Sequence, residues 1–449
     1  MFVPSSRLLY SVAAVLVPFA TVVGLVPSQA AFCFLIISLL VAAVILDMAR
    51  GFDSLEGVTV LCPPTVRLVK DRKGTIPLIV RQPQPADREI VVGLAMPAEF
   101  NSGDELRRVR IPGENQPSQL NWECVGTKRG RFPLLACYLE AFSPWGFWAV
   151  RTRAELKSEL RVYPDLRTDR RQVSALFLQR GALGTRVHRQ AGKGREFEKL
   201  REYLPSDTFE DIHWKATAKR GRPVTKVFQI ERTQEIYVIV DGSRLSARQV
   251  EAASNDGPNK KANILERYVN AALVLCWAAE RQGDRFGLIT FADKVYDFIR
   301  ARNGPAHFAV CRESIHTLQP KLVAPDFEEL FAFVRLRLRQ RSLIVLLTAL
   351  DDPLLGESFV RHLHVLSRQH LVLVCLMQPP GIGPLFSGPE VQSTDDIYER
   401  LAGHLRWKRL MEVGVSVRRE GALFSLMDNE RLSAQVVSQY LEARQRQLL

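Results

Sequence analysis

The sequence predicts a chain of three parts: an N-terminal transmembrane helical hairpin, an all-β sandwich, and an α/β domain built on a doubly wound, mainly parallel sheet. Two long apolar runs without a charged residue open the chain. Short alternating runs broken by Pro, Gly and Asn follow, and then continuously apolar strands alternate with helices. With 449 residues and a hydrophobic fraction of 47%, the chain is long enough to form several cores. The expected boundaries are 1–50 for the hairpin, 57–164 for the sandwich, 165–235 for a basic connector and 236–449 for the α/β domain.

The hairpin is predicted from the apolar runs at residues 8–26 and 31–46. At about 1.5 Å per residue, the first run is long enough to cross a bilayer and the second is slightly shorter. Arg7 precedes the hairpin, Arg50 follows it, and the turn between the runs has no Lys or Arg. The positive-inside rule therefore places both ends, and the soluble part, in the cytoplasm. A cleaved signal peptide is the alternative, because residues 28–30 resemble a cleavage site.

The cysteines support the same compartment. The seven cysteines are widely scattered and form no C-x-x-C pair. This pattern predicts neither a disulfide framework nor a zinc site, and it favours a reducing environment.

In the β region, turn signals recur at a spacing that predicts a sandwich or barrel of about seven or eight strands. The strand that begins near Arg129 leads into a segment rich in aromatic residues, Trp145, Phe147 and Trp148. These rings suit either an exposed docking tip or a plug between two domains, and we expect the plug.

Basic charge is concentrated around the connector. Residues 161–232 hold 17 Lys or Arg against nine Asp or Glu, which is +8 of the formal net charge of +13. Such a patch suits anionic lipid, an acidic protein or nucleic acid, and the first two are favoured beside a membrane. The alternative is a solvated surface whose basic side chains pair with the acidic run of the same segment.

The α/β domain is predicted from apolar strands separated by helices, a pattern typical of a mainly parallel sheet covered on both faces. In this layout ligands bind at the carboxyl ends of the strands. No G-x-G-x-x-G or Walker A sequence follows these strands, so a nucleotide site is not supported. The expected strands are residues 236–241, 284–293, 294–300, 342–350, 370–377 and 414–418.

Residues 192–232 are too polar for a core element and too patterned for a linker, since an acidic run precedes a basic run with aromatic residues between them. This segment resembles the signature of the bacterial domain-of-unknown-function-58 family, which pairs it with a von Willebrand A-like fold. Ser206 and His213 stand where the family usually has Gly and Asp. The matching residues are Glu196, Phe197, Leu200, Arg201, Glu202, Tyr203, Pro205, Asp207, Ile212, Trp214, Lys215, Ala216, Thr217, Ala218 and Lys219.

The resemblance implies a function that composition cannot supply. Family members are often encoded beside MoxR-type AAA+ ATPases and are thought to act as non-enzymatic partners in the assembly or maturation of protein complexes. We therefore expect a multi-pass adaptor in the bacterial inner membrane that binds an AAA+ ATPase and no nucleic acid. The signature residues expected to bind partners are Glu196, Arg201, Glu202, Tyr203, Asp207, His213, Trp214, Lys215 and Lys219.

The resemblance also raises the question of a metal. A von Willebrand A domain commonly holds a divalent ion through Asp-x-Ser-x-Ser and ligands from later loops, and hard oxygen ligands suit Mg²⁺. Asp241 and Ser243 match the start of this pattern. Leu245, Pro325 and Ala349 stand where further oxygen ligands are usual, so we expect a degenerate site and no cofactor.

Two other classes of function stay open. Asp211, His213 and Lys215 alternate, and in an extended segment they would share one face and could form the general base of a membrane-associated hydrolase. A nucleic-acid-binding protein that uses the basic patch is the third hypothesis, and its affinity would fall steeply with salt.

We expect residues 201–219 to hold the two soluble domains in one orientation, with Trp214 buried at their junction and the flanking charges paired. A large apolar ring rarely stays exposed. Replacing a fully buried Trp214 by Ala would cost about 3–5 kcal/mol.

Overall fold

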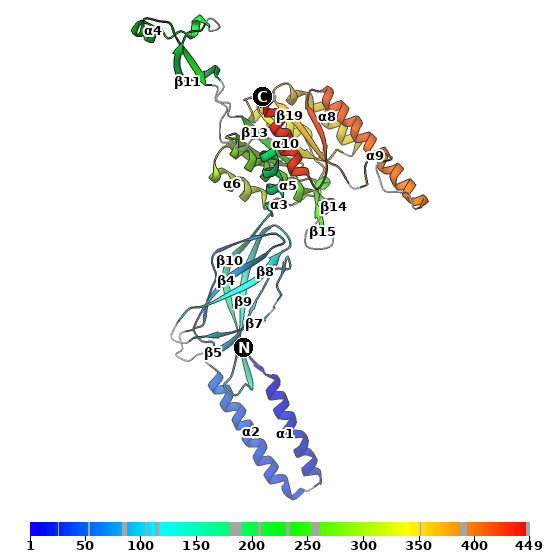
Figure 1. Cartoon of the computed structure of the whole chain (residues 1–449). Coiled ribbons are helices and arrows are strands. Elements are labelled where there is room, and N and C mark those ends of the chain that lie inside the picture. The colour runs from blue at the N-terminus through cyan, green and yellow to red at the C-terminus, as the bar shows by residue number, and fades with distance from the viewer. Residues whose placement is uncertain are drawn as a thin grey trace. The chain divides into compact units, whose positions relative to one another are not determined.

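The computed structural model describes most of the chain and divides it into two compact units, Met1–Pro164 and Asp165–Leu449 (Figure 1). Each unit is described separately below. The described residues are 1–25, 27–52, 54–82, 88–103, 106–112, 116–179, 191–204, 208–229, 234–252, 260–350, 352–379, 381–386 and 393–445.

The first unit opens with strand β1 (Phe2–Pro4) and two apolar helices, α1 (Ser6–Leu25) and α2 (Ala30–Gly51). The helices run side by side and are joined by the short turn η1 (Pro27–Gln29) (Figure 1). Their most apolar windows have mean hydropathies of 2.2 and 2.7 and are only 6% and 11% buried inside the protein. Helices of this length with exposed apolar surface are suited to a bilayer. Two membrane-compatible N-terminal helices are thus confirmed, while the number of crossings and the identity of the membrane stay predictions.

The rest of the first unit consists of two β-sheets. Buried residues of both sheets, such as Leu78, Trp122 and Leu139, share one hydrophobic core. The first sheet has the order β1-β10-β9-β5-β7, with β3 also paired to β10, and the second has the order β2-β4-β8-β6. The strands are β2 (Thr59–Leu61), β3 (Thr65–Val69), β4 (Lys73–Arg81), β5 (Arg88–Leu94), β6 (Phe100–Asn101), β7 (Leu106–Ile111), β8 (Ser118–Gly126), β9 (Gly130–Phe142) and β10 (Trp148–Tyr163).

The turn between β9 and β10 is attached to helix α2 through Asp47. This carboxylate is 1% exposed and accepts hydrogen bonds from the Ser143 hydroxyl at 2.5 Å, from the Trp145 amide at 2.9 Å and from the Phe147 amide at 3.2 Å. The Trp148 indole donates to the carbonyl oxygen of Val44 at 3.1 Å. The aromatic segment therefore contacts the end of a membrane helix, where we had expected a plug between two soluble domains.

The second unit is organised around a six-stranded sheet with the order β17-β16-β13-β18-β19-β20. The strands are parallel except for the edge strand β17, which is antiparallel to β16. The strand order reverses between β13 and β18, and in open α/β sheets ligands bind at such a point. The strands are β13 (Glu235–Asp241), β16 (Arg285–Phe291), β17 (Val295–Arg302), β18 (Leu343–Thr348), β19 (Leu371–Met377) and β20 (Leu423–Met427).

Helices cover both faces of this sheet. Successive residues of β13 alternate between the two cores: Val238 lies in one and Ile239 in the other. Burial on both faces explains why the strands are apolar at every position. One core includes α3 (Arg167–Gln179), α5 (Ile264–Arg281), α6 (Pro305–Ile315) and α10 (Leu432–Gln445), and the other includes α7 (Phe327–Arg337), α8 (Pro353–Ser367) and α9 (Thr394–Arg419).

Two expectations differ from this structure. The predicted strand at residues 414–418 lies inside helix α9, where Val417 is buried and Val415 is 45% exposed. Alternating valines suggested a strand, but the helix places Gly414 against the ring of Phe424 in the true last strand. The predicted basic connector contains helix α3, whose Phe177 is buried in the α/β core.

We predict that both chain ends lie on the cytoplasmic side. Strand β1 pairs with β10, and the Met1 amino group donates to the carbonyl oxygen of Arg151 at 2.9 Å, so the residues before α1 and after α2 are adjacent. Alkaline phosphatase, which is active only outside the cytoplasm, should be inactive when fused after Leu449 and active when inserted after Gln29. An active C-terminal fusion would contradict this topology.

Candidate functional site

The first candidate site lies where the order of the α/β sheet reverses, at the carboxyl ends of β13 and β18. Asp241 ends β13 and is fully buried. One carboxylate oxygen accepts from the Ser243 amide at 2.8 Å, and the other accepts from the Thr348 hydroxyl at 2.6 Å. Both oxygens that a metal would need are therefore already bonded within the protein.

The residues after Asp241 also serve the local turn. The 3-10 helix η3 (Arg244–Ala247) begins after Ser243, whose hydroxyl accepts from the Leu245 amide at 3.4 Å. The Ser246 hydroxyl donates to the Asp241 carbonyl oxygen at 2.6 Å. Leu245 is 2% exposed and has no oxygen to offer an ion.

The acidic residues of later loops cap helices. Asp326 accepts from the Glu329 amide at 3.0 Å at the start of α7, and Asp352 accepts from the Leu354 amide at 3.1 Å at the start of α8. Asp351 lies outside the described residues.

The residues at this edge do not fit a magnesium site. Mg²⁺ requires near-octahedral oxygen coordination. Here the Asp241 carboxylate accepts hydrogen bonds from the Ser243 amide and the Thr348 hydroxyl, and the Ser243 hydroxyl accepts one from the Leu245 amide. Within the described residues there is also no cluster of three or more His, Cys, Asp or Glu that could hold a metal. The chemical character of the loop, a closed and buried hydrogen-bond network, points to a structural role for Asp241.

Burial also sets the charge of this network. It raises the pKa of Asp241 above the usual range, while the hydrogen bonds from Thr348 and Ser243 act in the opposite direction. The Tyr268 hydroxyl donates to the carbonyl oxygen of Thr348 at 2.6 Å and extends the network into helix α5.

The second candidate site is the hairpin that carries the family-like signature, which we call the signature module. It consists of β11 (Ala191–Glu202), η2 (Phe209–Asp211), α4 (Trp214–Arg220) and β12 (Val224–Gln229). Strands β11 and β12 are antiparallel, and Ile212, Val224 and Thr225 form the buried centre. The module is drawn in green in Figure 1.

Three residues of the signature module explain how helix α4 is built. His213 Nδ1 accepts from the Ala216 amide at 3.0 Å and so caps the helix start. The Thr217 hydroxyl accepts from the Val224 amide at 3.1 Å and attaches the helix to β12. Gly221 ends the helix with a φ of 65°, a left-handed conformation that glycine adopts without strain.

The general-base hypothesis required Asp211, His213 and Lys215 to share one face of an extended segment. The structure places them in a 3-10 turn and at a helix start instead. Asp211 accepts from the Thr208 hydroxyl at 2.5 Å, and His213 Nδ1 is bonded to the backbone of its own helix. His213 thus caps its own helix and Asp211 bonds to a neighbouring hydroxyl, and within the described residues neither forms a hydrogen bond or ion pair with Lys215.

The prediction that Trp214 is buried is wrong. Its side chain is 69% exposed, Phe209 is 74% exposed and Leu204 is 51% exposed. A two-stranded hairpin with one short helix has too little core to enclose a Trp ring at the first helical position. The Tyr203 ring lies 5.8 Å from that of Phe209, so these two rings form one aromatic pair on the module.

The charges of the module are only partly paired. Arg222 lies 2.5 Å from Glu202 in an exposed ion pair. Within the described residues, Lys215, Lys219 and Arg220 make no ion pair, so helix α4 presents a cationic surface next to Trp214. Of the remaining signature residues, Arg201 pairs with Thr225 across the strands, while Asp207 and the side chain of Glu196 lie outside the described residues.

Comparison with known proteins finds a family model that matches this module and most of the sheet. Residues 199–381 match the family model described as protein of unknown function DUF58. The chain is similar to the solved structure of the conserved hypothetical protein BatB from Bacteroides thetaiotaomicron, with 14% identity over 47% of this chain and 99% of that chain and a TM-score of 0.31. It is also similar to an aerotolerance-related membrane protein from Bacteroides fragilis, with 14% identity over 46% of this chain and 98% of that chain and a TM-score of 0.31. No curated protein matches the chain.

A cavity of about 1260 Å³ lies in the second unit, and Arg248, the residue that follows η3, is part of its wall. Its walls combine basic and acidic side chains. The pKa of Arg248 in this wall is lowered, mainly by burial and to a smaller degree by the positive charge of the nearby Arg244. Sequence reasoning missed this cavity because its charged residues come from distant segments. They are Arg248, Asp352, Glu357, Arg361, Arg406, Arg409 and Glu412.

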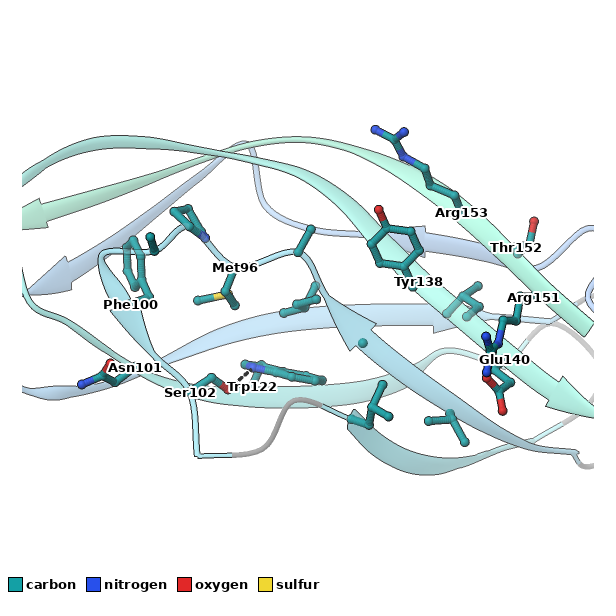
Figure 2. Close-up of a pocket in the computed structure, with 18 of the residues that line it drawn as sticks. Met96, Phe100, Asn101, Ser102, Trp122, Tyr138, Glu140, Arg151, Thr152 and Arg153 are labelled. Atoms are coloured by element: carbon teal, nitrogen blue, oxygen red, sulfur yellow. Dashed lines mark hydrogen bonds and ion pairs between the residues drawn. The ribbon is translucent and has the colours of Figure 1, made fainter. Parts of the chain in front are cut away.

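A groove of about 1060 Å³ in the β domain has mostly apolar walls (Figure 2). The Trp122 indole is fully buried and donates to the Ser102 hydroxyl at 2.9 Å, with Met96 nearby in the same view. Arg151 pairs with Glu140 at 2.6 Å on the groove wall. Apolar walls and a closed ion pair provide contact surface rather than a reacting pair of side chains.

We predict that Mg²⁺ and Mn²⁺ bind weakly, because both oxygens of Asp241 already accept hydrogen bonds within the protein and the Leu245 side chain has no oxygen. Titration of either ion into the full-length protein in detergent should give no calorimetric isotherm at sub-millimolar metal. An isotherm that disappears in Asp241→Ala would show that other oxygens complete the site.

We also predict that Asp241→Asn changes the pH dependence of folding. Because the folded-state pKa of Asp241 is raised, its contribution to the free energy of unfolding is full below the unfolded pKa of about 3.9 and is lost as pH rises through the folded value. The amide of an Asn side chain has an oxygen that can accept from the Ser243 amide and an NH₂ group that can donate to the Thr348 hydroxyl, but it does not titrate. The stability of the variant relative to the parent should therefore increase as pH rises above about 4. Hydrogen exchange of peptides covering β13 and β18 measures this difference, and a pH-independent difference would refute it.

Proposed function

We propose that this protein is a membrane-anchored, non-enzymatic adaptor that binds protein partners through its signature module. Its two domains are, in this proposal, an all-β sandwich and a von Willebrand A-like domain with a degenerate metal site. The partner class is a MoxR-type AAA+ ATPase acting in the assembly or maturation of protein complexes, and the location is the cytoplasmic face of the bacterial inner membrane.

The exposed surface of the signature module carries this proposal. Trp214 and Phe209 are large aromatic side chains at 69% and 74% exposure, and solvent-exposed rings of this size mark interaction surfaces. The cations of α4 beside them suit an acidic partner surface, because complementary charge speeds encounter and selects the partner.

The two sheets of the first unit support the sandwich, since strands from both contribute alternate side chains to one core. In the second unit, the first to sixth strands of the main sheet lie in the order 3-2-1-4-5-6 with one antiparallel edge strand. This order and the Asp-x-Ser start of the first loop support a von Willebrand A-like domain. The bonded state of the Asp241 oxygens favours partner binding without a metal bridge.

The hydrolase alternative lacks support in the geometry. Asp211 accepts from the Thr208 hydroxyl and His213 Nδ1 accepts from the Ala216 amide, so the two side chains are bonded to separate local partners. A general base must reach the proton that it removes, and it must be free to accept it.

The test compares Phe209→Ala with Trp214→Ala in the full-length, affinity-tagged protein from its native membrane. We expect each change to reduce recovery of an AAA+ ATPase, identified by mass spectrometry, about tenfold or more, because exposed aromatic anchors dominate interface energy. The thermal midpoint should hardly change, since the rings contribute little to the core. Tyr398→Ala in helix α9, where the ring is 71% exposed, is the matched control and should keep recovery normal.

Two outcomes would contradict the proposal. One is normal ATPase recovery by both variants, and the other is salt-sensitive binding of RNA or DNA that needs no protein partner. A large fall in the thermal midpoint of Trp214→Ala would show instead that the ring is structural.

A further inference from the structure

We propose that a cavity at the base of the β domain binds the phosphate of an anionic phospholipid headgroup. The cavity has a volume of about 520 Å³ and lies within the first unit. Three guanidinium groups line it, from Arg7 in α1, Arg50 in α2 and Arg108 in β7. The inference does not depend on the adaptor function, because the signature module contributes nothing to the cavity.

Among the described residues that line the cavity, positive charge exceeds negative charge. Within the described residues, none of the three arginines makes an ion pair, and all three are exposed to solvent. Glu89 is the carboxylate that lines the cavity with them. Asp47 lies close by, but it is buried and its oxygens are used by the turn after β9. Three positive charges against one lining carboxylate leave an excess for an anion.

The position of the cavity selects a lipid as the source of that anion. Arg7 is the second residue of α1 and Arg50 the second-last of α2, so both arginines stand where the apolar helices would leave the hydrocarbon. The Arg50 guanidinium lies 5.7 Å from the centre of the Trp145 ring. Trp is enriched at the level of the headgroups, which places the turn and the cavity beside phosphates.

The cavity is also built before any ligand arrives. The Ser5 hydroxyl donates to the Gly146 carbonyl oxygen, and the Ser5 amide donates to the Phe147 carbonyl oxygen at 2.9 Å. Gly146 has a φ of 75°, and a Cβ there would lie 3.0 Å from Nη1 of Arg7. The positive φ therefore favours glycine in this turn, and its missing Cβ leaves room for the Arg7 side chain. A preformed site loses less ordering entropy on binding.

The chemistry of three arginines fits a phosphate. A guanidinium presents parallel N–H donors that match two phosphate oxygens, and such charge-assisted bonds are the stronger kind. Arg108 belongs to a β-strand rather than to a membrane helix, so one of the three donors reaches the headgroup from the soluble domain.

Arg108→Gln gives the most direct test, because it leaves the charges that flank the membrane helices unchanged. Full-length protein in neutral detergent is titrated with phosphatidylglycerol or phosphatidylcholine, and bound lipid is counted by native mass spectrometry. We expect preferential binding of phosphatidylglycerol, weakened about tenfold by Arg108→Gln and further by the Arg7→Gln, Arg50→Gln, Arg108→Gln triple variant. The triple variant Arg335→Gln, Arg337→Gln, Arg339→Gln removes the same charge from the α/β domain and should bind like the parent.

Competition by inorganic phosphate distinguishes the two sources of the anion. Millimolar phosphate should leave phosphatidylglycerol bound. Displacement of the lipid at that concentration would assign the cavity to free phosphate and overturn the proposal. Equal lipid binding by the parent and Arg108→Gln, or equal losses in the two triple variants, would also overturn it.

Discussion

The attachment of Asp47 to the turn between β9 and β10 is the interaction on which the first unit depends. A carboxylate at the end of an apolar helix, 1% exposed, would be costly to bury without partners. One hydroxyl and two backbone amides compensate for the water that it loses. Because these donors belong to a β-turn and the acceptor to a helix, the membrane hairpin and the β domain share one rigid connection.

The start of the chain reinforces that connection. Strand β1 pairs with β10, so the first helix leaves the same sheet to which the second helix returns. Removing residues 1–30 by signal cleavage would leave β10 without this partner. The β1 pairing thus favours a retained hairpin over the signal-peptide alternative, by an argument that the apolar runs alone could not provide.

Much of the α/β domain could be predicted from the sequence, because burial on both faces makes strands such as β13 apolar at every position. The sequence also indicated that Asp241 and Ser243 match the beginning of the metal-binding motif Asp-x-Ser-x-Ser. What the sequence could not supply was three-dimensional: only the structure shows that Thr348, more than a hundred residues away, occupies one oxygen of Asp241. The same limit hid the arginine cavity, whose residues come from α1, α2 and β7.

Trp214 shows the limit of reasoning from residue type. Large rings are usually buried when a core exists to enclose them, and the expectation assumed such a core. Among the described side chains of the signature module, Ile212, Val224 and Thr225 are the buried ones, and the Trp214 ring stays exposed although the backbone around it is fixed by His213 and Thr217. An exposed ring on a fixed backbone loses little conformational entropy when a partner covers it. The signature residues therefore divide into those that build the helix, such as His213 and Thr217, and those that the helix displays, such as Trp214.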